Sequence, residues 1–158
     1  HEQATVAEEL CRRIAQRLAH SLITPYEAEL LYDFALTIAD AVDAMEHTAE
    51  LLVISQVGTL PTPLMDAAKG IERAAELTVA ATWELARVRQ LGEYYEQVRK
   101  LKRQGDRLVR RALGELYTRG GSTQELLPLH DVAESLRETI LLQERIARIA
   151  DLLRVKDA

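Results

Sequence analysis

Apolar side chains recur every three or four residues along most of the chain, which is the spacing of an amphipathic α-helix. No segment alternates apolar and polar residues at the period of two that a half-buried strand requires. One apolar stripe, after Pro25, consists of Leu31, Phe34, Ala35, Ile38, Val42, Met45, Ala49 and Leu52. A second, near the C-terminus, consists of Leu129, Val132, Ala133, Leu136, Ile140, Ala147 and Ala150. The pattern therefore predicts an all-α fold.

Glycine and proline interrupt this pattern at three breaks. At the first break, Thr24 can cap a helix, Pro25 suits the first helical position and Glu27 completes a capping box. The second break covers residues 57–63, where Thr62 is the expected cap. Both positions predict the start of a long helix.

The third break is a Gly-Gly pair at residues 120–121, followed by a Ser-x-x-Glu capping box from Ser122 to Glu125. Pro128 lies just inside the helix that this box begins, which leaves open the possibility that the regular helix begins one turn later. Gly92 is a weaker interruption, at which a bend and a loop are both compatible with the sequence.

Five helices follow from these breaks, and together they predict one elongated bundle of antiparallel helices. We expect them at residues 1–22, 25–56, 63–91, 93–118 and 124–155. At 1.5 Å per residue a helix of thirty residues is roughly 45 Å long. A chain of 158 residues buries roughly 70% of its unfolded surface, so one domain of this size needs no disulfide.

The second and fifth of these helices resemble each other at a separation of 98 residues. Phe34 aligns with Val132, Ala35 with Ala133, Ile38 with Leu136, Val42 with Ile140 and Ala49 with Ala147. Two tandem three-helix units explain this alignment, with a first helix that would precede His1. The alternative is that any two amphipathic helices can be aligned in this way.

Charge is distributed unevenly along the chain. The net charge is −5, but residues 99–111 contain seven basic residues and one acid, so this stretch carries +6 and the remainder −11. On a helical wheel one side is cationic, with Arg99, Lys100, Arg103, Arg107, Arg110 and Arg111. The other side is apolar, with Tyr94, Val98, Leu101, Gly105, Leu108, Ala112 and Leu116.

This cationic face predicts contact with an anionic partner, and three partners remain open: lipid headgroups beside a membrane transporter, an acidic protein surface, or phosphate itself. The alternative is a solvated face that pairs with the surplus carboxylates of the chain. Nucleic acid is not expected, because no aromatic residues alternate with the cations and the chain is acidic overall.

Catalysis is not expected either. The histidines at positions 1, 20, 47 and 130 lie far apart, and no nucleophile motif or phosphate-binding glycine loop accompanies them. Cys11 is the sole cysteine, which excludes an intramolecular disulfide and favours a small buried apolar role. Trp83 is expected in the core or at an interface between helices. No membrane span or signal sequence is visible.

Several short motifs, in this order and spacing, resemble the PhoU-like accessory family that accompanies Pit-type inorganic phosphate transporters. They are Ile23-Thr24-Pro25-Tyr26, Tyr94-Tyr95, Gly105-Asp106-Arg107-Leu108, Arg110-Arg111-Ala112-Leu113, Ala150-Asp151-Leu152-Leu153 and Val155-Lys156. The resemblance implies a fold of two three-helix bundles and a non-enzymatic protein in the cytoplasm that regulates phosphate transport. It also implies docking on the transporter or the adjacent membrane face, and a homo-oligomer.

Members of that family commonly bind iron or another transition metal through acidic motifs, and here those motifs are incomplete. Thr5 stands in one aspartate position, and Lys102 and Gln104 replace the acidic companions of Asp106. In the final helix the matching positions hold Arg137, Glu138 and Leu141.

Of the expected helices, the one at residues 25–56 retains the most acidic residues at the positions of these metal-binding motifs. Asp40 and Asp43 occupy two of the matching positions, and Asp43, Glu46 and Glu50 share one flank at helical spacing. An iron or zinc site at Asp40, Asp43, Glu46 and Glu50 is therefore the alternative to a solvated acidic flank. We expect no cofactor, and an oligomerising helical scaffold is a third possibility.

Overall fold

The computed structural model describes residues 2–20, 28–85, 91–120 and 122–156, and within them it contains five α-helices and no strand. The helices are α1 (Glu2–His20), α2 (Ala28–Ile54), α3 (Thr62–Glu84), α4 (Leu91–Arg119) and α5 (Thr123–Lys156). The expectation of an all-α helical bundle is confirmed. His1 and the Thr24, Pro25 and Glu27 capping box lie outside the described residues.

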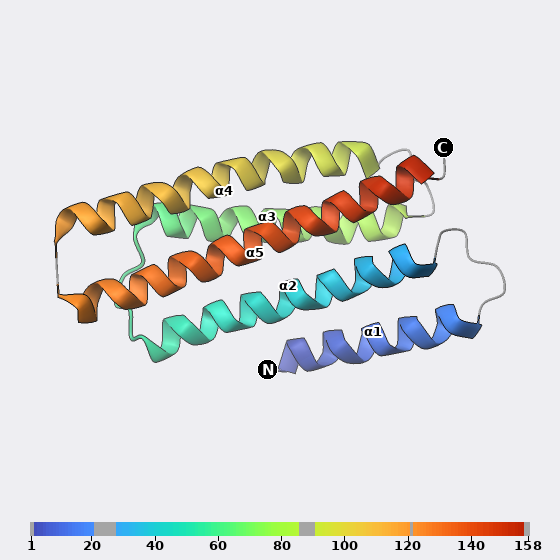
Figure 1. Ribbon diagram of the computed structural model, residues 1–158, viewed down its shortest axis with the longest axis horizontal. Coiled ribbons are helices and arrows are strands. Elements are labelled where there is room, and N and C mark those ends of the chain that lie inside the picture. Colours follow the sequence, from blue (N-terminus) through green and yellow to red (C-terminus); the bar gives the residue numbers. More distant parts are fainter. Residues whose placement is uncertain (1, 21–27, 86–90, 121, 157–158) are drawn as a thin grey trace.

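Helices α3, α4 and α5 form a three-helix unit in which each helix contacts the other two. On the other side of α5 lies α2, and α1 packs against α2 (Figure 1). In that view α4 and α1 lie along opposite long edges, with α5 running diagonally between them. Along their described lengths the backbones of α2 and α3 do not approach each other closely, although both helices pack on α5. The helices thus form one unit of three and one of two.

The core follows the apolar stripes that the sequence shows. One cluster joins α2, α3, α4 and α5 around Phe34, Val98 and Ile146, and a second joins α3, α4 and α5 around Leu64 and Val109. A much smaller cluster, of Cys11, Ala35 and Ala39, joins α1 to α2. Helix α1 is therefore held by far less buried surface than the other four.

Two predicted helix starts need correction. The third helix was expected to end at residue 91 and the fourth to begin at residue 93, but α3 ends at Glu84 and α4 begins at Leu91. The buried side chain of Leu91 anchors the first turn of α4. Gly92 lies inside this turn, where a Cβ would come 3.2 Å from Nε of Arg154 on α5. The helix starts early because tertiary packing outweighs the helix-breaking tendency of glycine.

Thr62 is not the cap of α3. Pro61 occupies the N-cap position with φ −53° and ψ 140°, makes no side-chain capping bond, and accepts backbone bonds from Leu64 and Met65 at 2.9 and 3.1 Å. Of the two possible starts of the last helix, the later one is wrong. Helix α5 begins at Thr123 and contains Pro128 within it.

The glycine stop before α5 is confirmed. Gly120 follows the last residue of α4 with φ +64°, the left-handed conformation that favours glycine at a helix end. The backbone N–H of Leu126 donates to the Ser122 carbonyl at 3.1 Å, which holds the turn ahead of Pro128.

Candidate functional site

The cationic face predicted on residues 99–111 is present as an exposed stripe on α4. All six of its members are exposed to solvent, and we call them the α4 basic stripe: Arg99, Lys100, Arg103, Arg107, Arg110 and Arg111. The opposite face of the same helix is buried against α3 and α5, with Tyr94, Val98, Ala112 and Leu116 each less than a tenth exposed. Burial of that apolar face fixes the direction in which the cations point.

Few of these cations are neutralised. Arg99 and Arg111 pair with Glu96 and Glu115 of their own helix, at 3.5 and 2.8 Å. Arg110 donates from Nε to the carbonyl oxygen of Asp106 at 3.1 Å, which leaves its charge uncompensated.

For Lys100, Arg103 and Arg107 no ion pair exists within the residues that the structure describes. The pairing with surplus carboxylates that the sequence left open is therefore confined to two stripe residues and to acids of α4. The stripe remains available to an external anion.

The acids predicted as a metal site on α2 do not form one among the described side chains. Asp40 and Asp43 are exposed, and Glu46 and Glu50 are half-buried. Oε1 of Glu46 accepts the backbone N–H groups of Gln3 at 2.8 Å and Ala4 at 3.2 Å, so this carboxylate caps the first turn of α1.

No group of three His, Cys, Asp or Glu residues comes together as metal ligands anywhere in the described ranges. Glu46 thus has a structural role that the sequence did not show, because its partners lie 42 and 43 residues away along the chain.

In the second half of the chain, Asp106 of α4 and Glu144 of α5 are paired with cations of the protein itself. Nζ of Lys102 lies 2.9 Å from Oδ2 of Asp106 and 4.0 Å from Oε2 of Glu144, joining α4 to α5. Arg148 lies 3.5 Å from the other oxygen of Glu144. Since Lys102, Asp106 and Glu144 are each less than a quarter exposed, this cluster is a structural contact between helices. Leu141 and Arg137 are exposed and add no ligand.

Cys11 is the small buried residue that the sequence predicts. Its Sγ lies 3.1 Å from the carbonyl oxygen of Ala35 on α2, to which the thiol donates. Burial, and secondarily the negative charge of Asp40, raises the pKa of the Cys11 thiol. The thiol therefore stays protonated near neutral pH, which is the unreactive form.

The described histidines lie apart from one another. His20 and His47 are exposed at separate places on α1 and α2. His130 lies on α5, with Nδ1 3.4 Å from Oδ1 of Asp131 and its ring 6.4 Å from that of Tyr117. None of these contacts joins a histidine to a Ser, Cys or Thr nucleophile. The expectation of a non-enzymatic protein stays a prediction.

Trp83 differs from one of its two expected roles. Its side chain is 83% exposed on α3, so it is not part of the core. Val79, one turn earlier on the same face, is 59% exposed. The remaining expectation, an anchor at an interface, is compatible with this position.

A buried polar contact between α3 and α4 was not apparent from the sequence. The hydroxyl groups of Thr78 and Tyr94 lie 2.8 Å apart, and Thr78 also bonds to the carbonyl oxygen of Ala74 at 2.9 Å. Burial raises the pKa of Tyr94 to about 12, although the hydrogen bond with Thr78 opposes part of this rise. Tyr94 is therefore mostly neutral in the fold at pH values well below 12.

This shift predicts a loss of stability in alkali. An unfolded tyrosine ionises near pH 10, so the contribution of neutral Tyr94 is complete below about pH 10 and declines as the pH rises toward 12. We expect the free energy of unfolding to fall by roughly 1 kcal/mol per pH unit more in the native protein than in Tyr94→Phe. Urea denaturation at several pH values measures this difference, and equal slopes would show that Tyr94 is not buried as described.

No protein-family model and no curated protein matches the chain. No described helix combines the length and apolar character needed to cross a bilayer. The resemblance to the PhoU-like family and the expected homo-oligomer stay predictions.

Proposed function

We propose that this protein is a non-enzymatic accessory protein of inorganic phosphate transport, which docks through the α4 basic stripe on the anionic membrane face beside a Pit-type transporter. The observation that carries the docking is the charge of Lys100, Arg103 and Arg107, which lie on an exposed helix face and have no ion-pair partner among the described residues. The transport role rests on the sequence motifs that resemble the PhoU-like family.

The shape of the stripe suits a flat anionic surface. Its residues recur along one side of α4 over three turns, so a helix lying parallel to the membrane can present all six cations at once. Each Lys or Arg near an anionic leaflet contributes about 1 kcal/mol of attraction. In this proposal the helix acts on a neighbouring transporter by binding beside it.

The metal-binding alternative has less support. Among the described acids, Glu46 caps α1 and Asp106 and Glu144 face Lys102, so these carboxylates are already used within the protein. An iron or zinc content of the purified protein, measured by elemental analysis, would favour the alternative.

Reversal of three stripe charges tests the proposal. We expect Arg103→Glu, Arg107→Glu and Arg110→Glu together to weaken binding to vesicles containing phosphatidylglycerol at least tenfold, because three attractive charges become repulsive. Co-sedimentation with vesicles measures the binding, and vesicles of pure phosphatidylcholine give the background.

A matched control carries the same change in net charge elsewhere. Arg12, Arg73 and Arg137 are exposed, lie on α1, α3 and α5, and each pairs with an acid of its own helix. Their triple reversal to Glu should leave vesicle binding within about twofold of the native protein. Equal loss in both variants, or no loss in the first, would reject the α4 basic stripe as the docking face.

A further inference from the structure

Two large apolar side chains are exposed where α4 ends and α5 begins. Tyr117 of α4 is 63% exposed, and Leu127 of α5 is 56% exposed. The centre of the Tyr117 ring lies 6.4 Å from that of His130, and Leu127 precedes His130 by one helical turn on α5. Figure 1 shows both helix ends at the same end of the bundle. The two side chains therefore gather around one residue and form a small apolar patch.

Tyr117 continues the α4 basic stripe. It follows Arg110 by seven residues and Arg103 by fourteen, and seven residues are close to two helical turns, so all three share one side of α4. Tyr117 lies roughly 10 Å beyond Arg110 along the helix axis. Between them lies Gly114, which is exposed and has no atom within 4 Å of its Cβ position. A surface that meets the stripe can therefore also reach Tyr117.

The acids beside this apolar patch have partners within the protein. Glu115 pairs with Nε of Arg111 at 2.8 Å. Oδ1 of Asp131 lies 3.4 Å from Nδ1 of His130. These contacts weaken the repulsion that the two carboxylates would exert on an anionic surface, whereas the cations of the stripe attract it.

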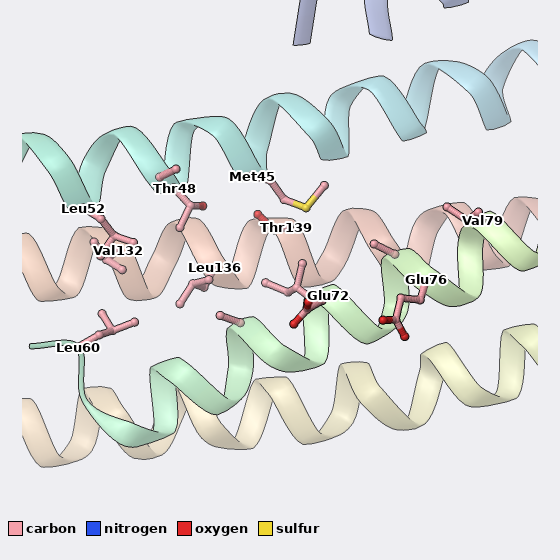
Figure 2. A pocket seen from close by; sticks show the side chains of 14 residues that line it. Met45, Thr48, Leu52, Leu60, Glu72, Glu76, Val79, Val132, Leu136 and Thr139 are labelled. Carbon is pink, nitrogen blue, oxygen red and sulfur yellow. The ribbon is translucent and has the colours of Figure 1, made fainter. Parts of the chain in front are cut away.

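A second apolar surface of the molecule is less suited to anionic lipid. It is an open hollow of about 590 Å³, lined mainly by α2, α3 and α5, with side chains such as Met45 and Leu136 (Figure 2). None of its lining residues belongs to α4, and Glu72 and Glu76 of α3 stand at its edge. Carboxylates at that edge oppose contact with an anionic leaflet, whereas the patch at Tyr117 adjoins a row of cations.

We propose that Tyr117 and Leu127 form an anchor that enters the headgroup region of the anionic membrane on which the α4 basic stripe docks. Tyrosine suits this position because its ring is apolar and its hydroxyl group is polar, and it is enriched at membrane interfaces. Leucine adds apolar area that leaves water on binding. The inference rests on the proposed function and adds an orientation to it, in which the end of α4 next to α5 lies deepest in the interface.

Insertion of the anchor can be measured by fluorescence. Trp83 is the sole tryptophan of the chain and is 83% exposed, so Trp83→Phe removes the native signal without a change in the core. In this background we expect Tyr117→Trp to emit at shorter wavelength when phosphatidylglycerol vesicles are added. Vesicle lipids with brominated acyl chains should quench this emission, because the indole ring reaches the boundary between headgroups and acyl chains.

Tyr32→Trp in the same background is the matched control for this measurement. Tyr32 is 40% exposed on α2, which packs on α5 and along its described length does not bring its backbone close to α4. Its emission should stay the same when vesicles are added, and brominated lipids should not quench it.

Salt separates the anchor from the stripe. Tyr117→Ser with Leu127→Ser removes apolar area and no charge, so vesicle binding should weaken about tenfold at every salt concentration from about 0.01 M to about 0.15 M. The dependence on salt should stay that of the native protein. Tyr32→Ser with Leu36→Ser makes the same pair of changes at exposed side chains of α2 and should bind like the native protein. Circular dichroism should show native helix content in both double variants.

Two results would overturn the anchor while the stripe remains the docking face. In both, the native protein binds phosphatidylglycerol vesicles more weakly as salt rises. In the first, Tyr117→Trp keeps the emission of a solvent-exposed side chain in the bound protein. In the second, the Tyr117 and Leu127 serine variant binds as tightly as the native protein. Absence of binding by the native protein at low salt would overturn the proposed function and the anchor together.

Discussion

Replacement of Phe34 by alanine is expected to lower the free energy of unfolding by about 3–5 kcal/mol. The ring is 4% exposed and belongs to the cluster that joins α2 to α3, α4 and α5, so its removal leaves a cavity between the two halves of the protein. Urea denaturation followed by the helical circular dichroism signal measures the loss.

Val42→Ala on the same helix serves as the control for Phe34→Ala. Val42 lines an open hollow between α1 and α2 and is only half-buried, so its truncation should cost about 1 kcal/mol or less. If Val42→Ala were as damaging as Phe34→Ala, Val42 would be buried in solution and not half-buried as described.

Insertion of a branched side chain at Gly105 is expected to destabilise the contact between α4 and α5 by about 2–3 kcal/mol. Gly105 is buried, and a Cβ at this position would lie 2.7 Å from Cδ1 and 3.3 Å from Cγ1 of Ile140. Gly105→Val adds three carbons in this space, and the gain in helix propensity over glycine is smaller than the cost. Thermal and urea unfolding both report the change.

Two further variants separate overpacking at Gly105 from a general effect of replacing glycine. Gly114 lies on the same helix, is exposed and has no neighbouring atom within 4 Å of its Cβ position, so Gly114→Ala should stabilise the protein by up to about 1 kcal/mol. Ile140→Ala and Gly105→Val together should destabilise the protein by less than the sum of the two single changes, because the shorter side chain at position 140 makes room for valine. Additive effects would place the strain somewhere other than this contact.

The sequence predicted the helices and the α4 basic stripe because both depend on local spacing. The three- and four-residue periodicity indicates which residues share one face of a helix. On α4 the apolar face, which includes Val98 and Ala112, is the buried one. Gly120 marked the end of α4, because Gly120 itself adopts the left-handed conformation directly after the helix. The early start of α4 was missed because burial of Leu91 is a tertiary effect.

The remaining parts of the site depend on contacts between distant residues, for which one sequence carries no signal. Glu46 was assigned to a possible metal site, but its carboxylate caps α1 by accepting from Gln3 and Ala4, which lie 43 and 42 residues earlier in the chain. The bond between Thr78 and Tyr94 joins two helices, and neither residue lies in a motif.

The salt dependence of vesicle binding tests the central claim most directly, because screening acts on exposed charges. The Debye length falls from about 30 Å at 0.01 M salt to about 8 Å at 0.15 M salt. If the α4 basic stripe docks on an anionic membrane face, binding of the native protein to phosphatidylglycerol vesicles should weaken steeply over this range. The Arg103, Arg107 and Arg110 reversal should show weak binding at every salt concentration. Binding of the native protein that does not change with salt would contradict the account.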